Sequence, residues 1–136
     1  MILSLNKIET KEGIAQLNKI GADKKWFLSF YNELNKEFYN IDFHSKDDDK
    51  LNIGVCIICK YKDITDCSLF IFPTFRRQGF ASEIISILIA KFEDVQFTVS
   101  NYNSNSLKLF ESIQSLNISS INKRNNTIIF SKNNLF

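Results

Sequence analysis

Apolar and polar positions divide the chain into short segments of two kinds. Segments in which apolar residues alternate with polar ones, or form short runs between turn residues, predict strands. Segments in which apolar residues recur three and four positions apart predict helices. The expected strands cover residues 1–7, 40–45, 51–61, 67–72, 95–100, 118–122 and 127–131, and the expected helices begin at Thr10, Asp23, Ser82 and Ser106. This order of elements gives a mixed α/β sheet flanked by about four helices.

The second expected helix has an aromatic side. Asp23 is a suitable N-cap residue for this helix. The positions that follow at helical spacing are Phe27, Phe30, Tyr31, Leu34 and Phe38. Such a stripe is typical of a helix that packs against the core, so we expect Phe38 to lie near the end of a core-packed helix.

A basic turn joins the expected strand at residues 67–72 to the helix that follows it. Arg76 and Arg77 supply two positive charges, and Gly79 lets a ligand approach the backbone closely. A helix start also offers unpaired N–H groups and a partial positive charge, which together favour anions. The turn therefore predicts a phosphate-binding cradle.

Two spaced motifs lie in this part of the chain. Arg76-x-x-Gly79-x-Ala81, which follows the strand, resembles the Q/R-x-x-G-x-G/A acyl-CoA signature of the GNAT family of N-acetyltransferases. Asn103-x-x-Ser106-x-x-Leu109-Phe110-Glu111 resembles the downstream N-x-x-A-x-x-L-Y-E segment of that family, and the matched region covers residues 69–113. The resemblance implies the GNAT fold: a mixed, mostly antiparallel sheet with a splayed central strand pair.

The resemblance also implies that acetyl-CoA binds as co-substrate. The residues that would hold its pyrophosphate are Arg76, Arg77, Gln78, Gly79, Phe80, Ala81 and Ser82. The pantetheine arm would pair with the strand edge at Phe70, Ile71 and Phe72 and would form a hydrogen bond with Asn103. Ser106 and Phe110, on the following helix, would complete the site.

Acyl transfer to an amine, which the resemblance implies, requires a base for the amine and a proton for the departing thiolate. Asp63 is the predicted base because it shares a strand face with Ile71. Asp66 falls on the other face and fits a surface turn equally well, while His44 fits an exposed position near a hairpin. The tyrosine that donates the proton in many members is Phe110 here, and Tyr102 is the alternative acid.

The composition fits one domain spanning residues 1–136. The chain has 136 residues, of which 44% are hydrophobic, enough to bury a sizeable core. Its formal net charge of +2 comes from dispersed basic residues, which argues against nucleic acid as a partner. No apolar stretch approaches the length of a membrane span, and no secretory signal is evident, so we expect a cytoplasmic protein without a membrane partner.

The metal-binding and redox motifs are incomplete. Three cysteines are an odd number for a disulfide framework, and one histidine is too few for a zinc site. Cys56 and Cys59 would point to opposite faces of one strand, so we expect buried thiols. The acidic turn at residues 46–50 lacks the ligand spacing of a calcium loop. No metal is expected.

The sequence therefore predicts an enzyme, an N-acetyltransferase that moves an acetyl group from acetyl-CoA to an amine of a small molecule, peptide or protein. A non-catalytic acyl-CoA-binding or protein-interaction module remains open as an alternative. A toxin-like enzyme that acetylates charged tRNA is a third reading, but the dispersed charge predicts no basic face. The acceptor stays unidentified, and a homodimer is left open.

Overall fold

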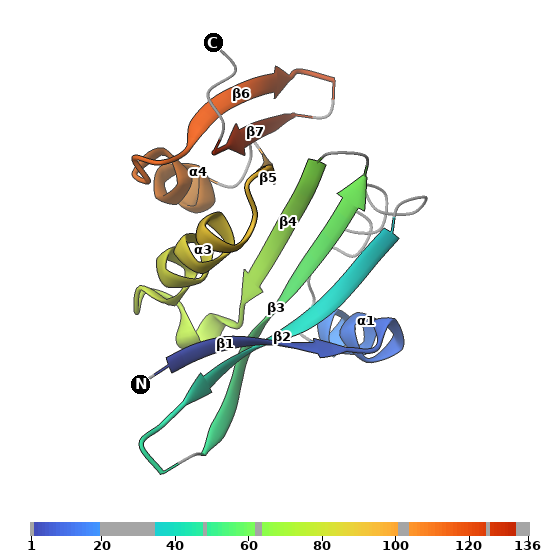
Figure 1. Ribbon diagram of the computed structural model, residues 1–136, viewed down its shortest axis with the longest axis vertical. Coiled ribbons are helices and arrows are strands. Elements are labelled where there is room, and N and C mark those ends of the chain that lie inside the picture. The colour runs from blue at the N-terminus through green and yellow to red at the C-terminus, as the bar shows by residue number, and fades with distance from the viewer. Residues whose placement is uncertain are drawn as a thin grey trace.

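The computed structural model describes residues 2–19, 35–47, 49–61, 64–100, 104–124 and 126–132. The elements in chain order are β1 (Ile2–Ile8), α1 (Thr10–Lys19), β2 (Asn35–His44), β3 (Lys50–Tyr61), β4 (Ile64–Ile71), the 3-10 turn η1 (Pro73–Phe75), α3 (Phe80–Lys91), β5 (Val95–Ser100), α4 (Ser104–Glu111), β6 (Asn117–Asn122) and β7 (Thr127–Ser131) (Figure 1). This order agrees with the predicted succession of strands and helices, except that Phe38, expected near the end of a helix, lies in β2.

The strands form one seven-stranded sheet in the order β1-β2-β3-β4-β5-β7-β6. Every neighbouring pair is antiparallel except β4 and β5, which are parallel. The predicted mixed, mostly antiparallel sheet is therefore confirmed. The described residues contain three α-helices where the sequence predicted about four, and none of these helices is long and apolar enough to cross a membrane.

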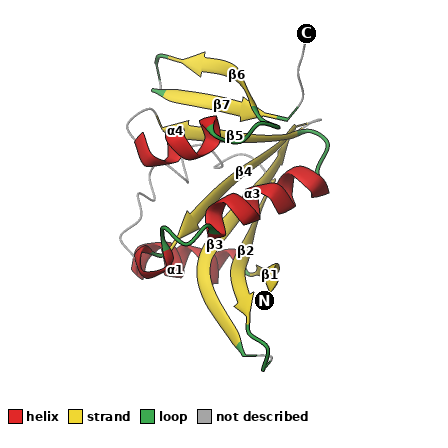
Figure 2. Cartoon of the chain, turned by 90° about the vertical axis from the view of Figure 1, so that its left-hand side faces the viewer, coloured by secondary structure: helices red, strands yellow, loops and turns green. Residues whose placement is uncertain are grey.

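Helices cover both faces of the sheet. In Figure 2, α3 and α4 lie on one face and α1 lies on the other. The larger core, on the α3 and α4 face, includes Ile84 and Leu88 of α3 and alternate residues of the strands. The smaller core lies under α1 and is built from Leu17, Phe38, Val55, Ile57 and Cys59. The sheet is thus the middle layer of three.

Phe38 lies in a strand, which corrects the prediction that it ends an aromatic helix. It belongs to β2, is 1% exposed, and packs under α1. The register of β2 is set by strand pairing on both sides, since Phe38 lies opposite Ile8 of β1 and Ile57 of β3. These long-range ladders override the local helical spacing. The rest of the aromatic stripe, residues 27–34, lies outside the described residues.

Gly54 allows β3 and β4 to approach closely. A Cβ at this position would lie 2.3 Å from the carbonyl oxygen of Phe70, so any larger residue would push the strands apart. The β2–β3 register also shifts between Ile41 and Asp42, where one residue of β3 has no counterpart in β2. β3 therefore combines a bulge with a close approach to β4 at this glycine.

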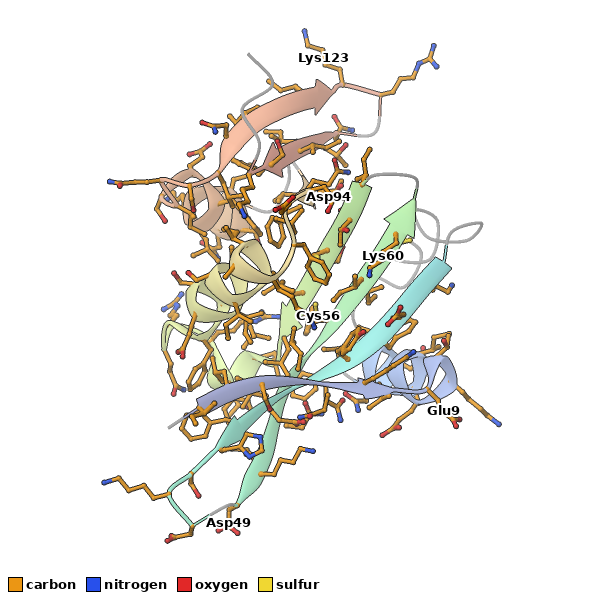
Figure 3. All side chains as sticks on the ribbon, in the orientation of Figure 1. Glu9, Asp49, Cys56, Lys60, Asp94 and Lys123 are labelled. Atoms are coloured by element: carbon orange, nitrogen blue, oxygen red, sulfur yellow. The ribbon has the colours of Figure 1, made fainter. Side chains whose placement is uncertain are left out.

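All three cysteines are free and buried, as predicted. Cys56 lies within the sheet and belongs to the larger core, whereas Cys59 belongs to the smaller core on the opposite face (Figure 3). Burial raises the pKa of Cys56 to about 12 and that of Cys59 to about 11. Thiols held in this way are protonated near neutral pH and are poor nucleophiles.

We predict that Gly13→Ala destabilises the protein, although alanine is usually favoured over glycine in helices by about 1 kcal/mol. A Cβ at Gly13 in α1 would lie 2.2 Å from Cδ1 and 2.9 Å from Cβ of Phe38. Because the second contact involves the root of a buried side chain, rotation of the ring does not relieve it. We expect a loss of about 1–3 kcal/mol in the free energy of unfolding, measured by urea denaturation.

Asn18→Ala is the matched control for this prediction. Asn18 is exposed on the same helix, so its replacement leaves the core unchanged and should shift the urea midpoint little. A Gly13→Ala protein as stable as the wild type would show that α1 packs less tightly on Phe38 than the structure indicates.

Candidate functional site

The β4–β5 ladder ends after three residue pairs. Thr65, Asp66 and Cys67 lie opposite Val95, Gln96 and Phe97. On its other side β4 stays paired with β3 as far as Ile71. Figure 1 shows the two strands diverging beyond the ladder, so the predicted splayed central pair is confirmed. From Leu69 to Ile71, β4 has no strand partner on the side of β5 among the described residues.

A tight turn leads from the end of β4 into α3. The η1 turn carries Phe75, whose N–H donates to the carbonyl oxygen of Phe72 at 2.8 Å. Arg77 then has a φ of 65°, and Gly79, the N-cap residue of α3, has a φ of 81°. Two left-handed residues in one turn reverse the chain within a few positions and bring α3 back over the sheet.

The N-terminus of α3 is open. Gly79 has no side chain to cap the helix, and a Cβ added there would meet nothing within 4 Å. The first-turn N–H groups of a helix have no partner inside the helix and carry a partial positive charge. The predicted pyrophosphate cradle around Gly79 is therefore physically suited to an anion, with open space directly over the backbone.

Arg76 binds the turn to the strand that precedes it. Its Nε donates a hydrogen bond to the carbonyl oxygen of Ile71 at 2.9 Å. Its guanidinium carbon lies 4.9 Å from the centre of the Phe70 ring. Arg77 and Gln78 are exposed beside it. In this conformation Arg76 supports the end of β4, and Arg77 is the more available of the two charges.

The other residues of the predicted binding site are divided between the two faces of the sheet. Phe70 and Phe72 pack toward the smaller core, whereas Ile71 is 7% exposed in the larger one. Phe80 begins α3, and its ring lies 5.5 Å from that of Phe43. Ala81, which follows it, is half-buried. The aromatic side chains therefore pack against the two cores and fix the backbone at the end of β4 and the start of α3.

Phe110 occupies the core, which corrects the expectation that its side chain faces the cofactor. It is 6% exposed, and its ring centre lies 5.1 Å from that of Phe97 and 5.4 Å from that of Phe130. The apolar side of α4 presents it to β5 and β7. We therefore assign Phe110 to the core rather than to the acetyl-CoA site.

The remaining predicted site residues are placed only in part. Ser106 lies in α4 and is half-buried, and Ser82 lies in the first turn of α3. Asp63, Tyr102 and Asn103 lie outside the described residues. The base and the acid proposed from the sequence therefore remain predictions.

Asp66 is a titratable residue beside the point where β4 and β5 diverge. In the sequence it fitted a surface turn equally well. It lies within β4, one pair before the ladder ends, on the face opposite Cys67. Thr98 donates its hydroxyl to the Asp66 carboxylate at 3.1 and 3.3 Å. Burial raises the pKa of Asp66 to about 6, while hydrogen bonds from Thr98 and Gln96 oppose the rise. The signal for this site in the sequence was a polar residue within a strand whose neighbouring residues are buried.

A second polar cluster joins β1, β2 and β3. Ser4 Oγ and His44 Nε2 are 2.8 Å apart, so His44 is tied to β1 instead of being exposed near the hairpin. Asn6 donates to the buried carboxylate of Asp42 at 2.6 Å, and Lys50 lies 3.5 Å from the same oxygen. The described residues contain no group of three or more potential metal ligands. We interpret this cluster as a set of polar contacts that stabilises the β1 edge of the sheet.

Comparison with known proteins identifies the fold. No family model matches the chain, and no curated protein matches it. Several solved structures, however, have a similar fold. A domain from Methanocaldococcus jannaschii has a TM-score of 0.72 at 11% identity, with 96% of this chain and 97% of that one covered.

Two acetyltransferases are also similar over nearly their whole length. The ribosomal-protein-S18-alanine N-acetyltransferase of Escherichia coli has a TM-score of 0.63 at 17% identity, covering 96% of this chain and 92% of that one. An acetyltransferase of Bacillus subtilis, solved in complex with CoA, has a TM-score of 0.61 at 16% identity, with 98% of each chain covered. These likenesses show that the chain has the GNAT N-acetyltransferase fold.

We predict that Asp66→Asn stabilises the protein at neutral pH. The folded state retains the Asp66 proton up to about pH 6, whereas an unfolded aspartate releases its proton near pH 4. Wild-type stability therefore falls, relative to the variant, as pH rises through that window. By chemical denaturation, the advantage of the variant should grow between about pH 4 and pH 6 and reach roughly 1–3 kcal/mol above it.

Asp47→Asn serves as the control, because it removes an exposed carboxylate from the turn between β2 and β3. If both variants changed with pH in the same way, the effect would reflect net charge and not the environment of Asp66.

Proposed function

We propose that this protein is an N-acetyltransferase that moves an acetyl group from acetyl-CoA to an amine. The observation that carries the proposal is the interrupted β4–β5 ladder, followed by the open N-terminus of α3 at Gly79. Several solved acetyltransferases share the fold, and two of them were solved with CoA. The acceptor amine is not specified by these features.

Acetyl-CoA would bind along the splay. The N–H groups around Gly79 and the exposed charge of Arg77 suit the pyrophosphate, because charge-assisted hydrogen bonds to an anion are stronger than neutral ones. The edge of β4 from Leu69 to Ile71 suits the amide groups of the pantetheine arm, which would pair with it as an added strand does. A backbone N–H of β4 would polarise the thioester carbonyl.

Asp66 is our candidate for the base in place of Asp63. Its carboxylate lies beside the end of the ladder, on the side of the sheet opposite the larger core. In the reaction a C–N bond forms and the C–S bond breaks. The amine proton passes to Asp66, directly or through one water, and the thiolate takes a proton from solvent. A raised pKa suits this role because it makes the carboxylate a stronger proton acceptor.

We predict that acetyl-CoA binds the wild-type protein and that Gly79→Glu abolishes binding. The substitution places a negative charge beside the helix N-terminus and fills the open space above it. Calorimetric titration measures affinity, and a rise in melting temperature with added acetyl-CoA reports the same binding by mass action.

Ser86→Glu is the matched control, since it adds the same charge to an exposed position further along α3. It should leave acetyl-CoA affinity nearly unchanged. Absence of binding in the wild type even at about millimolar acetyl-CoA, the weakest affinity of interest, would remove the basis of the proposal.

We predict that Asp66→Asn lowers turnover by about 10²–10⁴-fold, the usual contribution of a positioned base, without weakening acetyl-CoA binding. Turnover can be followed over an amine and peptide panel by the CoA thiol released, because the protein's own cysteines are buried. The wild-type rate should rise with pH through about 6, which gives the pH–rate profile a rising limb. The variant should lose that limb.

Two further variants make this test specific. Thr98→Val removes a hydrogen bond that lowers the pKa of Asp66, so the limb should move to higher pH. His44→Asn removes the histidine on the same side of the sheet and should leave the limb in place. Acetyl-CoA binding without turnover across the whole panel would favour the non-catalytic module instead.

A further inference from the structure

The strand β6 forms an outer edge of the sheet. It pairs with β7 on its inner side, and no described strand pairs with it on the other. Figure 2 shows β6 as the last strand beyond β7. Natural edge strands are usually protected by charges, proline or bulges. Residues 117–122 contain no charge and no proline, and the first charge, Lys123, lies in the turn beyond the strand (Figure 3). Their one irregularity is a register shift between Ile118 and Ser120.

Two large apolar side chains are exposed on this strand. Ile118 is 49% exposed and Ile121 is 62% exposed. Residues three apart in a regular strand point to opposite faces, but the register of β6 shifts between Ile118 and Ser120. Ile118 therefore lies opposite Phe130, and Ile121 lies opposite Ile128. Both partners pack into the larger core, so the two isoleucines share that face.

The sequence of β6, Asn-Ile-Ser-Ser-Ile-Asn, reads the same in both directions. In an antiparallel pair of two such strands, a two-fold axis between Ser119 and Ser120 would place Ile118 of each copy opposite Ile121 of the other. The same axis would place Asn117 of each copy opposite Asn122 of the other. A two-fold interface requires this kind of self-complementarity, because the same surface must serve both partners.

We infer that β6 is a homodimer edge, at which two copies of this chain pair antiparallel and join their sheets into one. The four isoleucines, two from each copy, would then cover one another on a single face of the joined sheet. The occupant that fits is a second copy, because the edge is uncharged and its sequence is its own complement. The inference does not depend on acetyltransferase activity, since β5 and β7 lie between β6 and β4.

The dimer should be weak. Six strand residues from each copy are fewer than the about 20–30 residues a side of a standard stable interface. We expect sedimentation velocity on the full chain to show a reversible shift from monomer to dimer between about 1 µM and about 1 mM, a range typical of weak contacts. A monomer throughout that range would overturn the inference.

A pair of double variants tests the register. Asn117→Lys with Asn122→Lys would bring like charges together at both ends of the joined strands and should abolish the dimer. Asn117→Lys with Asn122→Glu would bring opposite charges together and should preserve it. Circular dichroism confirms that each variant is folded. Equal losses in both double variants would overturn the proposed register.

Single variants test the surface itself. Ile121→Lys should shift the monomer–dimer equilibrium toward the monomer by at least several-fold, because a charged side chain replaces an apolar one at the joined edge. Ile2→Lys is the matched control, since Ile2 is 67% exposed on β1, the other outer strand. Loss of the dimer in Ile2→Lys alone would place the contact at β1 and overturn the inference.

Discussion

The end of the parallel ladder between β4 and β5 is the constraint on which the site depends. Beyond Cys67, β4 pairs with β3 and with no other strand among the described residues, while β5 continues along β7. The two halves of the sheet remain one structure because the larger core contains residues of both, including Ile71 and Phe97, together with the buried side of α3. Side-chain packing therefore replaces backbone pairing, and it leaves strand edge groups available inside the sheet instead of at its margin.

The turn after β4 shows how the same backbone is prepared for an anion. Arg77 adopts a left-handed conformation, which costs a residue with a Cβ about 1–2 kcal/mol. Arg76 offsets part of that cost through its hydrogen bond to Ile71 and its contact with Phe70. These contacts hold the turn closed, and Gly79 keeps the first N–H groups of α3 accessible.

Local signals predicted this turn, because glycine, arginine and the change from strand to helix spacing all lie within a few residues. They also predicted the last two strands and most of the succession of elements along the chain. Phe38 was placed wrongly because its register depends on β1 and β3, which no local window contains. Phe110 was placed wrongly for a related reason: the motif gave its position on the helix but not its contact with Phe97 and Phe130.

The environment of Asp66 could not be predicted, because the position of a residue in a strand gives the face of the sheet but not the neighbours of its side chain. Its pKa depends on burial between β4 and β5 and on the hydroxyl of Thr98, neither of which is visible in the sequence. A carboxylate held at a cost in stability is typical of functional sites, where activity and stability oppose each other. This supports a working role for Asp66 over a structural one.

The proposed chemistry also explains why a core phenylalanine at position 110 is tolerable. An alkyl amine with a pKa near 10.4 leaves only about one molecule in 10³ unprotonated at pH 7, whereas a thiol with a pKa near 8.5 leaves as a thiolate close to ambient pH. Removing the amine proton is therefore the larger obstacle, and protonating the thiolate is the smaller one. Raising the pKa of Asp66 from its ordinary value to about 6 reduces the larger obstacle. A site with a half-buried carboxylate where β4 and β5 diverge meets the more demanding requirement, and solvent can meet the other.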